Sequence, residues 1–122
     1  MTENSIRLLE YSLREGNFAD FHRAEQDPST LSPGEVVRWD AYMTAAYRHF
    51  GNLVYQYPVG ALDRQMWQSY RNTLKKHLRM PSWQAWFEEN KVAFSTSLVE
   101  FVGRIIRELE AEWKIGAPQS EP

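Results

Sequence analysis

Hydrophobic residues recur at intervals of three and four positions along most of this chain, which is the spacing that places side chains on one face of an α-helix. The longest such pattern covers residues 34–57 and predicts the central helix of the protein. The other predicted helices cover residues 4–14, 18–26, 63–79, 81–91 and 95–115. No segment alternates polar and apolar residues over a useful length, so we expect no β-sheet.

Local sequence signals mark the ends of the central helix. Ser32 and Glu35 form a capping-box pattern, and Pro33 stands at the first helical position, where proline is favourable. Pro58 ends the helix because proline lacks the backbone N–H that a continuing helix needs. Gly60 permits the left-handed geometry of a turn. Since only about five residues precede the next helix, we expect the two helices to lie side by side and antiparallel.

The later helices carry similar signals. Asp63 can cap the helix that follows the turn, and Pro81 breaks that helix and begins another. Ser95 or Ser97 can cap the last helix. A sustained apolar stripe then predicts a long amphipathic helix. Its members are Leu98, Phe101, Val102, Ile105, Ile106, Leu109 and Trp113.

Together these patterns predict an all-α fold, a single-domain antiparallel helical bundle of about four to six helices. We expect a short N-terminal helix over residues 1–16, the bundle domain over residues 17–115 and a flexible tail over residues 116–122. At 122 residues the chain is about one domain long. A chain of this size can bury a sizeable core without disulfides.

Composition excludes several classes of site. The chain has no cysteine, so disulfides, thiolate nucleophiles, zinc–thiolate sites and iron–sulfur clusters are ruled out. A net charge of −2 provides no global basic field that would attract nucleic acid. No apolar run approaches the ~20 residues that a membrane-spanning helix needs. We therefore expect no transmembrane segment and, by default, a cytoplasmic location.

No residue pattern typical of catalysis or metal binding occurs. His22, His49 and His77 are never three or four positions apart, so no helix offers two of them to one metal. There is no Gly-x-Ser-x-Gly elbow and no glycine-rich phosphate loop. The last helix carries carboxylates that we expect to form a solvated face. They are Glu100, Glu108, Glu110 and Glu112. We therefore predict no cofactor, no metal and no enzymatic activity.

One side of the helix over residues 63–79 carries a basic stripe. Its members are Arg64, Arg71, Lys75 and Arg79. We expect Trp67 and Tyr70 on the opposite side of this helix, where they could not stack on the bases of a nucleic acid bound to the stripe. Four phosphate contacts would give a weak, strongly screened interaction with a logarithmic salt slope of about −3.6. We therefore expect a solvated face here rather than a nucleic-acid site.

Polar residues gather near the turn at Pro58. Asn52, Tyr55 and Gln56 stand at the end of the central helix, beside an otherwise apolar band. Trp67 and Arg71 are one turn apart and could lie opposite them. Two interpretations remain open: a polar layer that fixes the register of the two helices, or a small pocket or contact point for a partner.

Three aromatic residues, Trp83, Trp86 and Phe87, lie within five positions of a short helix. A short helix buries three such rings only where neighbouring helices surround it. Core packing is the favoured interpretation. The alternative is an exposed anchor for a partner, because tryptophan is enriched among the residues that dominate binding energy at interfaces.

An ordered set of residues resembles a pattern found in a group of small uncharacterised bacterial all-α proteins. The set is Asn52-Leu-Val-Tyr-Gln-Tyr, Gly60, Leu62-Asp63, Trp67, Arg71, Leu74, Pro81, Trp86-Phe87, Phe94-Ser95 and Phe101-Val102. The resemblance covers about residues 17–106 and implies a bacterial all-α protein. Many members begin with a membrane-spanning helix, whereas residues 1–16 here are too short and too charged to span a bilayer. The resemblance implies no activity, cofactor or catalytic residue.

These observations lead to a functional hypothesis. We expect a non-catalytic helical interaction module that acts through self-association or a protein partner. The alternatives are a small-molecule-binding domain, with a pocket near Asn52, Gln56, Trp67 and Arg71, and a weak nucleic-acid-binding domain that uses the basic stripe.

Overall fold

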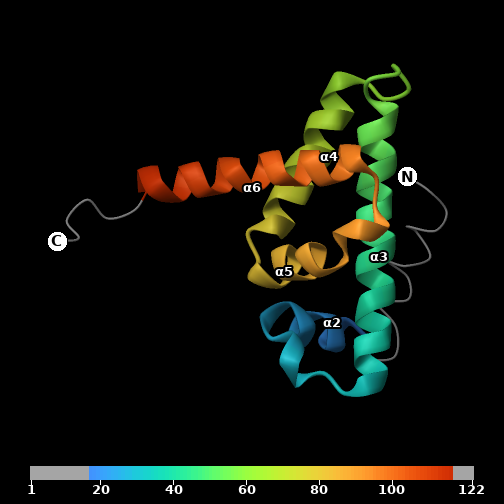
Figure 1. Cartoon of the computed structure of the whole chain (residues 1–122), viewed down its shortest axis with the longest axis vertical. Coiled ribbons are helices and arrows are strands. Elements are labelled where there is room, and N and C mark those ends of the chain that lie inside the picture. Colours follow the sequence, from blue (N-terminus) through green and yellow to red (C-terminus); the bar gives the residue numbers. More distant parts are fainter. Residues whose placement is uncertain (1–16, 117–122) are drawn as a thin grey trace.

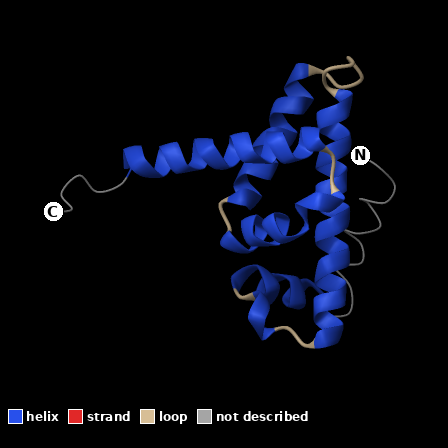
Figure 2. Cartoon of the chain, viewed as in Figure 1, coloured by secondary structure: helices blue, strands red, loops and turns tan. Residues whose placement is uncertain are grey.

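The computed structural model describes residues 17–116, which form five α-helices and two short 3-10 helices with no strand in this range (Figures 1 and 2). The elements are α2 (Asn17–Gln26), η1 (Pro28–Thr30), α3 (Pro33–Gln56), α4 (Arg64–Leu78), α5 (Pro81–Asn90), η2 (Lys91–Ala93) and α6 (Thr96–Gly116). The all-α prediction is confirmed. The helix expected over residues 4–14 and the tail after Gly116 lie outside the described residues.

The helix ends are set by the residues that the sequence indicated. Ser32 Oγ accepts a hydrogen bond from the Glu35 backbone N–H at 3.3 Å, and Glu35 Oε1 accepts one from the Ser32 N–H at 2.8 Å. Asp63 caps α4 by accepting from the Met66 N–H at 2.8 Å. Ser95 Oγ accepts from the Leu98 N–H at 3.2 Å, at the start of α6. Each bond satisfies a backbone donor that has no partner within its helix.

The turn after α3 brings α3 and α4 side by side and antiparallel (Figure 1). Gly60 has a φ of +81°, in the left-handed region where a Cβ atom would be strained. The Ala61 N–H donates to the Gln56 carbonyl oxygen at 3.0 Å and closes the turn. The rings of Tyr57 and Trp67 stack across it, with centroids 4.8 Å apart and planes within 6° of parallel. The predicted antiparallel pair of helices is therefore confirmed.

The core lies between α3 and the helices that cover it. Tyr47 is fully buried near its centre. Its ring contacts Trp83 at 5.4 Å and Phe87 at 4.6 Å between centroids, and it stacks on Trp86 at 5.7 Å. Its hydroxyl donates to the Trp83 carbonyl oxygen at 2.8 Å. Burial raises the pKa of Tyr47 well above its usual value, so this donor stays protonated.

Helix α6 runs across α3 and α4 rather than along them, and then extends beyond the rest of the bundle (Figure 1). Its first half is in the core, where Leu98 and Ile105 are buried. Its last turns are not: Trp113 is 74% exposed and Ile115 is 82% exposed. The predicted stripe therefore continues to a residue that has no core to pack against. Within residues 17–116, no helix is both long enough and apolar enough to cross a membrane.

Candidate functional site

The aromatic cluster of α5 lies in the core. Trp83 is 1% exposed and Trp86 is 7% exposed. The Trp83 indole N–H donates to Glu25 of α2 at 3.0 Å, and the Trp86 indole N–H donates to Asp40 of α3 at 2.9 Å. Each ring thus packs in the core while its polar edge ties α5 to a neighbouring helix. The core interpretation of this cluster fits the structure, and neither ring is available as an exposed anchor.

The basic stripe of α4 faces carboxylates of α6. Arg71 forms an ion pair with Glu108. The Lys75 ammonium lies 3.3 Å from Glu108 and also pairs with Glu112. The Arg79 guanidinium lies 3.1 Å from Glu112. The expectation of solvated faces is wrong for Arg71, Lys75 and Glu108, which are half-buried where α6 crosses α4. Arg79 and Glu112 are exposed, as expected, but they pair with each other.

These contacts shift pKa values in a consistent way. The pKa of Glu112 lies below its usual value, mainly because Lys75 donates a hydrogen bond to it. Burial alone would raise the pKa of Glu108, but the contacts with Arg71 and Lys75 outweigh burial and lower it. The same hydrogen bond with Glu112 raises the pKa of Lys75. The two carboxylates therefore offset half of the stripe's four positive charges at neutral pH. The fourth member of the stripe, Arg64, stands at the exposed start of α4.

The residues of the predicted pocket have their contacts in different places. Asn52 and Tyr55 are exposed and line an open hollow between α3 and the start of α6. Gln56 is half-buried at the last position of α3. Trp67 packs on Phe101 of α6 and Arg71 pairs with Glu108 of α6, so both face α6 and the expectation that Trp67 lies opposite the basic stripe is wrong. No described hydrogen bond links the polar residues, and both interpretations of the group stay predictions.

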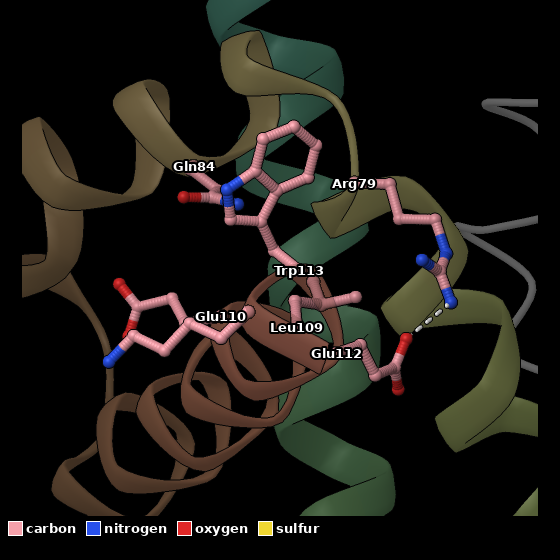
Figure 3. Close-up of a pocket in the computed structure, with 7 residues that line it drawn as sticks. Arg79, Gln84, Leu109, Glu110, Glu112 and Trp113 are labelled. Carbon is pink, nitrogen blue, oxygen red and sulfur yellow. Dashed lines mark hydrogen bonds and ion pairs between the residues drawn. The ribbon is translucent and has the colours of Figure 1, made fainter. Parts of the chain in front are cut away.

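The exposed end of α6 borders a second open hollow (Figure 3). Trp113 and Leu109 line it from α6, and Gln84 lines it from α5. Figure 3 shows Glu110 on the side of α6 away from Glu112, which pairs with α4. A large aromatic ring thus stands on a projecting helix with charged side chains beside it.

The sequence holds only part of the signal for this surface. Helix α6 has 21 residues and spans about 32 Å. It packs mainly on α3 and α4, and it crosses them instead of running along them (Figure 1). The length of its apolar stripe can be predicted from the sequence, whereas the crossing that leaves the end of the stripe in solvent cannot.

Two histidines are half-buried within the bundle. His77 stacks on Trp83, with ring centroids 4.3 Å apart and planes 9° from parallel. The Nδ1 atoms of His77 and His49 are buried and have no hydrogen-bond partner among the described residues. Burial lowers the pKa of both side chains. No group of three or more His, Asp or Glu residues in the described part of the chain could hold a metal ion.

No protein-family model, no curated protein and no solved structure matches this chain significantly. The resemblance to small bacterial all-α proteins therefore stays a prediction.

Proposed function

We propose that this protein is a non-catalytic interaction module and that the projecting end of α6 is its contact surface. The partner is a second copy or another protein. The observation that carries the proposal is the exposure of Trp113, at 74%, on an apolar stripe that begins in the core. Tryptophan combines a large apolar area with low conformational entropy, and it is enriched among the residues that dominate interface energies.

Other exposed hydrophobic residues do not form a comparable surface. Val36 and Val37 are exposed in the first turns of α3, Val59 in the turn before α4 and Val92 in η2, and no tryptophan is exposed beside them. Isolated apolar residues are normal on protein surfaces. At the end of α6, by contrast, half-buried Leu109 adjoins Trp113, and Ile115 exposes a further side of the same helix. Among residues 17–116, this helix end is therefore the place where an exposed tryptophan continues an apolar stripe out of the core.

Two alternatives have less support. A nucleic-acid site on α4 would have to break the ion pairs of Glu108 and Glu112 before phosphates could replace them. A small-molecule site near Asn52 would lack the Trp67 and Arg71 side chains that were expected to complete it. Ligand sites usually enclose most of the ligand, whereas the hollows at Asn52 and Trp113 are open.

The proposal is tested by replacing Trp113 with serine. Tyr55 gives a matched control, because it is an aromatic residue on α3 with nearly the same exposure, 72% against 74%. Association is measured by sedimentation velocity for the purified chain and by affinity capture from a bacterial lysate. We expect W113S to lose the association that the wild type and Y55S retain.

Stability is measured in parallel, by urea denaturation. Both replacements are at exposed positions, so the free energy of unfolding should change by less than about 0.5 kcal/mol. A W113S protein that is equally stable and associates as the wild type does would contradict the proposal.

A further inference from the structure

We propose that a second copy of this chain covers the end of α6, through an antiparallel pair of α6 helices held by reciprocal Glu110–Lys114 ion pairs. This inference rests on the proposed function, since it names the partner of the same surface. The geometry of three side chains carries it.

The first observation is a self-complementary pair of charges. Glu110 and Lys114 are both exposed on α6. They are four positions apart, so they share one flank of the helix, beside Trp113. Neither has an ion-pair partner among residues 17–116, whereas the charges on the opposite flank are bound to α4. One flank of the exposed helix end thus carries an acid and a base that are free for a partner.

The second observation concerns register. Two antiparallel helices related by a two-fold axis bring the same flank of each copy together. In a pair centred on position 112, Glu110 of one copy faces Lys114 of the other, and the reverse pair forms at the same time. Trp113 then lies between Leu109 and Trp113 of the second copy, within about one helical turn of each. A single register therefore pairs each Glu110 with a Lys114 and also brings the two Trp113 rings close together.

The third observation is that no like charges meet at the centre of this pair. Glu112 stands at the level of the two-fold axis but on the side of α6 away from Glu110 (Figure 3), where it pairs with Lys75 and Arg79 of its own copy. It therefore stays outside the contact. The hollow beside Trp113 also has open space for an aromatic side chain from outside.

The size of the contact predicts its strength. A tryptophan and its neighbours bury about 150–250 Å² per large ring, so a pair of helix ends falls below the roughly 1,200 Å² at the low end of stable interfaces. We therefore expect a weak dimer that dissociates on dilution. A larger, permanent assembly would need more apolar surface than the end of α6 offers.

Charge reversal tests this pairing. Sedimentation equilibrium of the full chain at low salt, from about 10 μM to about 1 mM, measures the dimer dissociation constant. Each of E110K and K114E alone should weaken the dimer at least about tenfold, because both pairs become repulsive. A one-to-one mixture of the two variants should recover the wild-type constant, because every facing pair is then of opposite charge. E100K, at an exposed position near the start of α6, is the matched control and should dimerise as the wild type does.

The outcomes separate this inference from the proposed function. A wild-type chain that is monomeric at every concentration overturns the dimer, and Trp113-dependent capture of another protein would then leave the proposed function standing. A dimer that W113S abolishes but that neither charge reversal weakens overturns the antiparallel register. A dimer that persists in W113S overturns both proposals.

Discussion

At the scale of single residues, burial decides which aromatic and histidine side chains are available for contacts. Tyr47 is fully buried, and its hydroxyl donates a hydrogen bond to the Trp83 carbonyl oxygen. Tyr55, eight positions later on the same helix, is 72% exposed. Removing the hydroxyl should therefore lower stability at Tyr47 and leave it almost unchanged at Tyr55.

Replacing Tyr47 with phenylalanine should lower the free energy of unfolding by about 1–2 kcal/mol, because the Trp83 carbonyl oxygen loses its buried donor. Urea denaturation at pH 7 measures this loss. The matched variant Y55F removes an exposed hydroxyl and should change stability by less than about 0.5 kcal/mol. An equal change in the free energy of unfolding of Y47F and Y55F would contradict a stabilising contribution from the Tyr47 hydrogen bond.

The half-buried histidines His49 and His77 predict a dependence of stability on pH. Burial lowers the pKa of His77 and His49 in the folded protein, while in the unfolded chain both return to about 6.5. As pH falls below about 6.5, the unfolded chain therefore binds protons first and the folded state loses stability. Above about 6.5 this contribution is fully present.

The measurement is urea denaturation at pH 7.5, 6.5 and 5.5, values that lie above the range in which the carboxylates titrate, at about 4.5. The wild type should become steadily less stable across the series. The double variant H49Q/H77Q should show a much flatter profile, even if it is less stable at every pH. An unchanged slope in the double variant would contradict the assignment to these histidines.

At the scale of elements, the ends of the helices could be predicted from sequence, and their crossings could not. Ser32 and Asp63 cap their helices through neighbours in the chain, so a short segment contains all the information. The ion pair of Arg71 with Glu108 joins residues 37 positions apart. It depends on how α6 crosses α4, which the spacing of apolar residues does not define. For this reason the basic stripe was expected in solvent.

Replacing either of two glycines with alanine should change the free energy of unfolding, in opposite directions for Gly60 and Gly34. Gly60 has a φ of +81°, where a Cβ atom is strained, so G60A should destabilise the protein by about 1 kcal/mol. Gly34 lies in the first turn of α3, and an added Cβ atom would meet nothing within 4 Å. G34A should therefore stabilise by about 0.4–1 kcal/mol. Thermal and urea denaturation of the pair checks both signs, and a stabilising G60A would contradict the turn geometry.

At the scale of the whole molecule, the core uses most of the aromatic residues and leaves one helix end uncovered. In the sequence, Trp83 and Trp86 were the candidates for an exposed anchor, and Trp113 was only the last residue of an apolar stripe. The packing reverses these roles. Helices α2, α3 and α5 enclose the first two rings, while Trp113 is exposed near the end of α6, which extends past the other helices (Figure 1). The class of fold could therefore be predicted from the sequence, whereas the surface that remains for a partner depended on tertiary packing.

The central claim is that the end of α6 carries self-association and that the buried rings do not. It is tested most directly by NMR of the tryptophan indole N–H signals in a dilution series, with each signal assigned by single substitution. We predict that the Trp113 signal moves steadily with protein concentration while the signals of Trp83 and Trp86 stay fixed. A Trp113 signal that is constant across the whole series, or a concentration-dependent shift of the Trp83 or Trp86 signal instead, would contradict the claim.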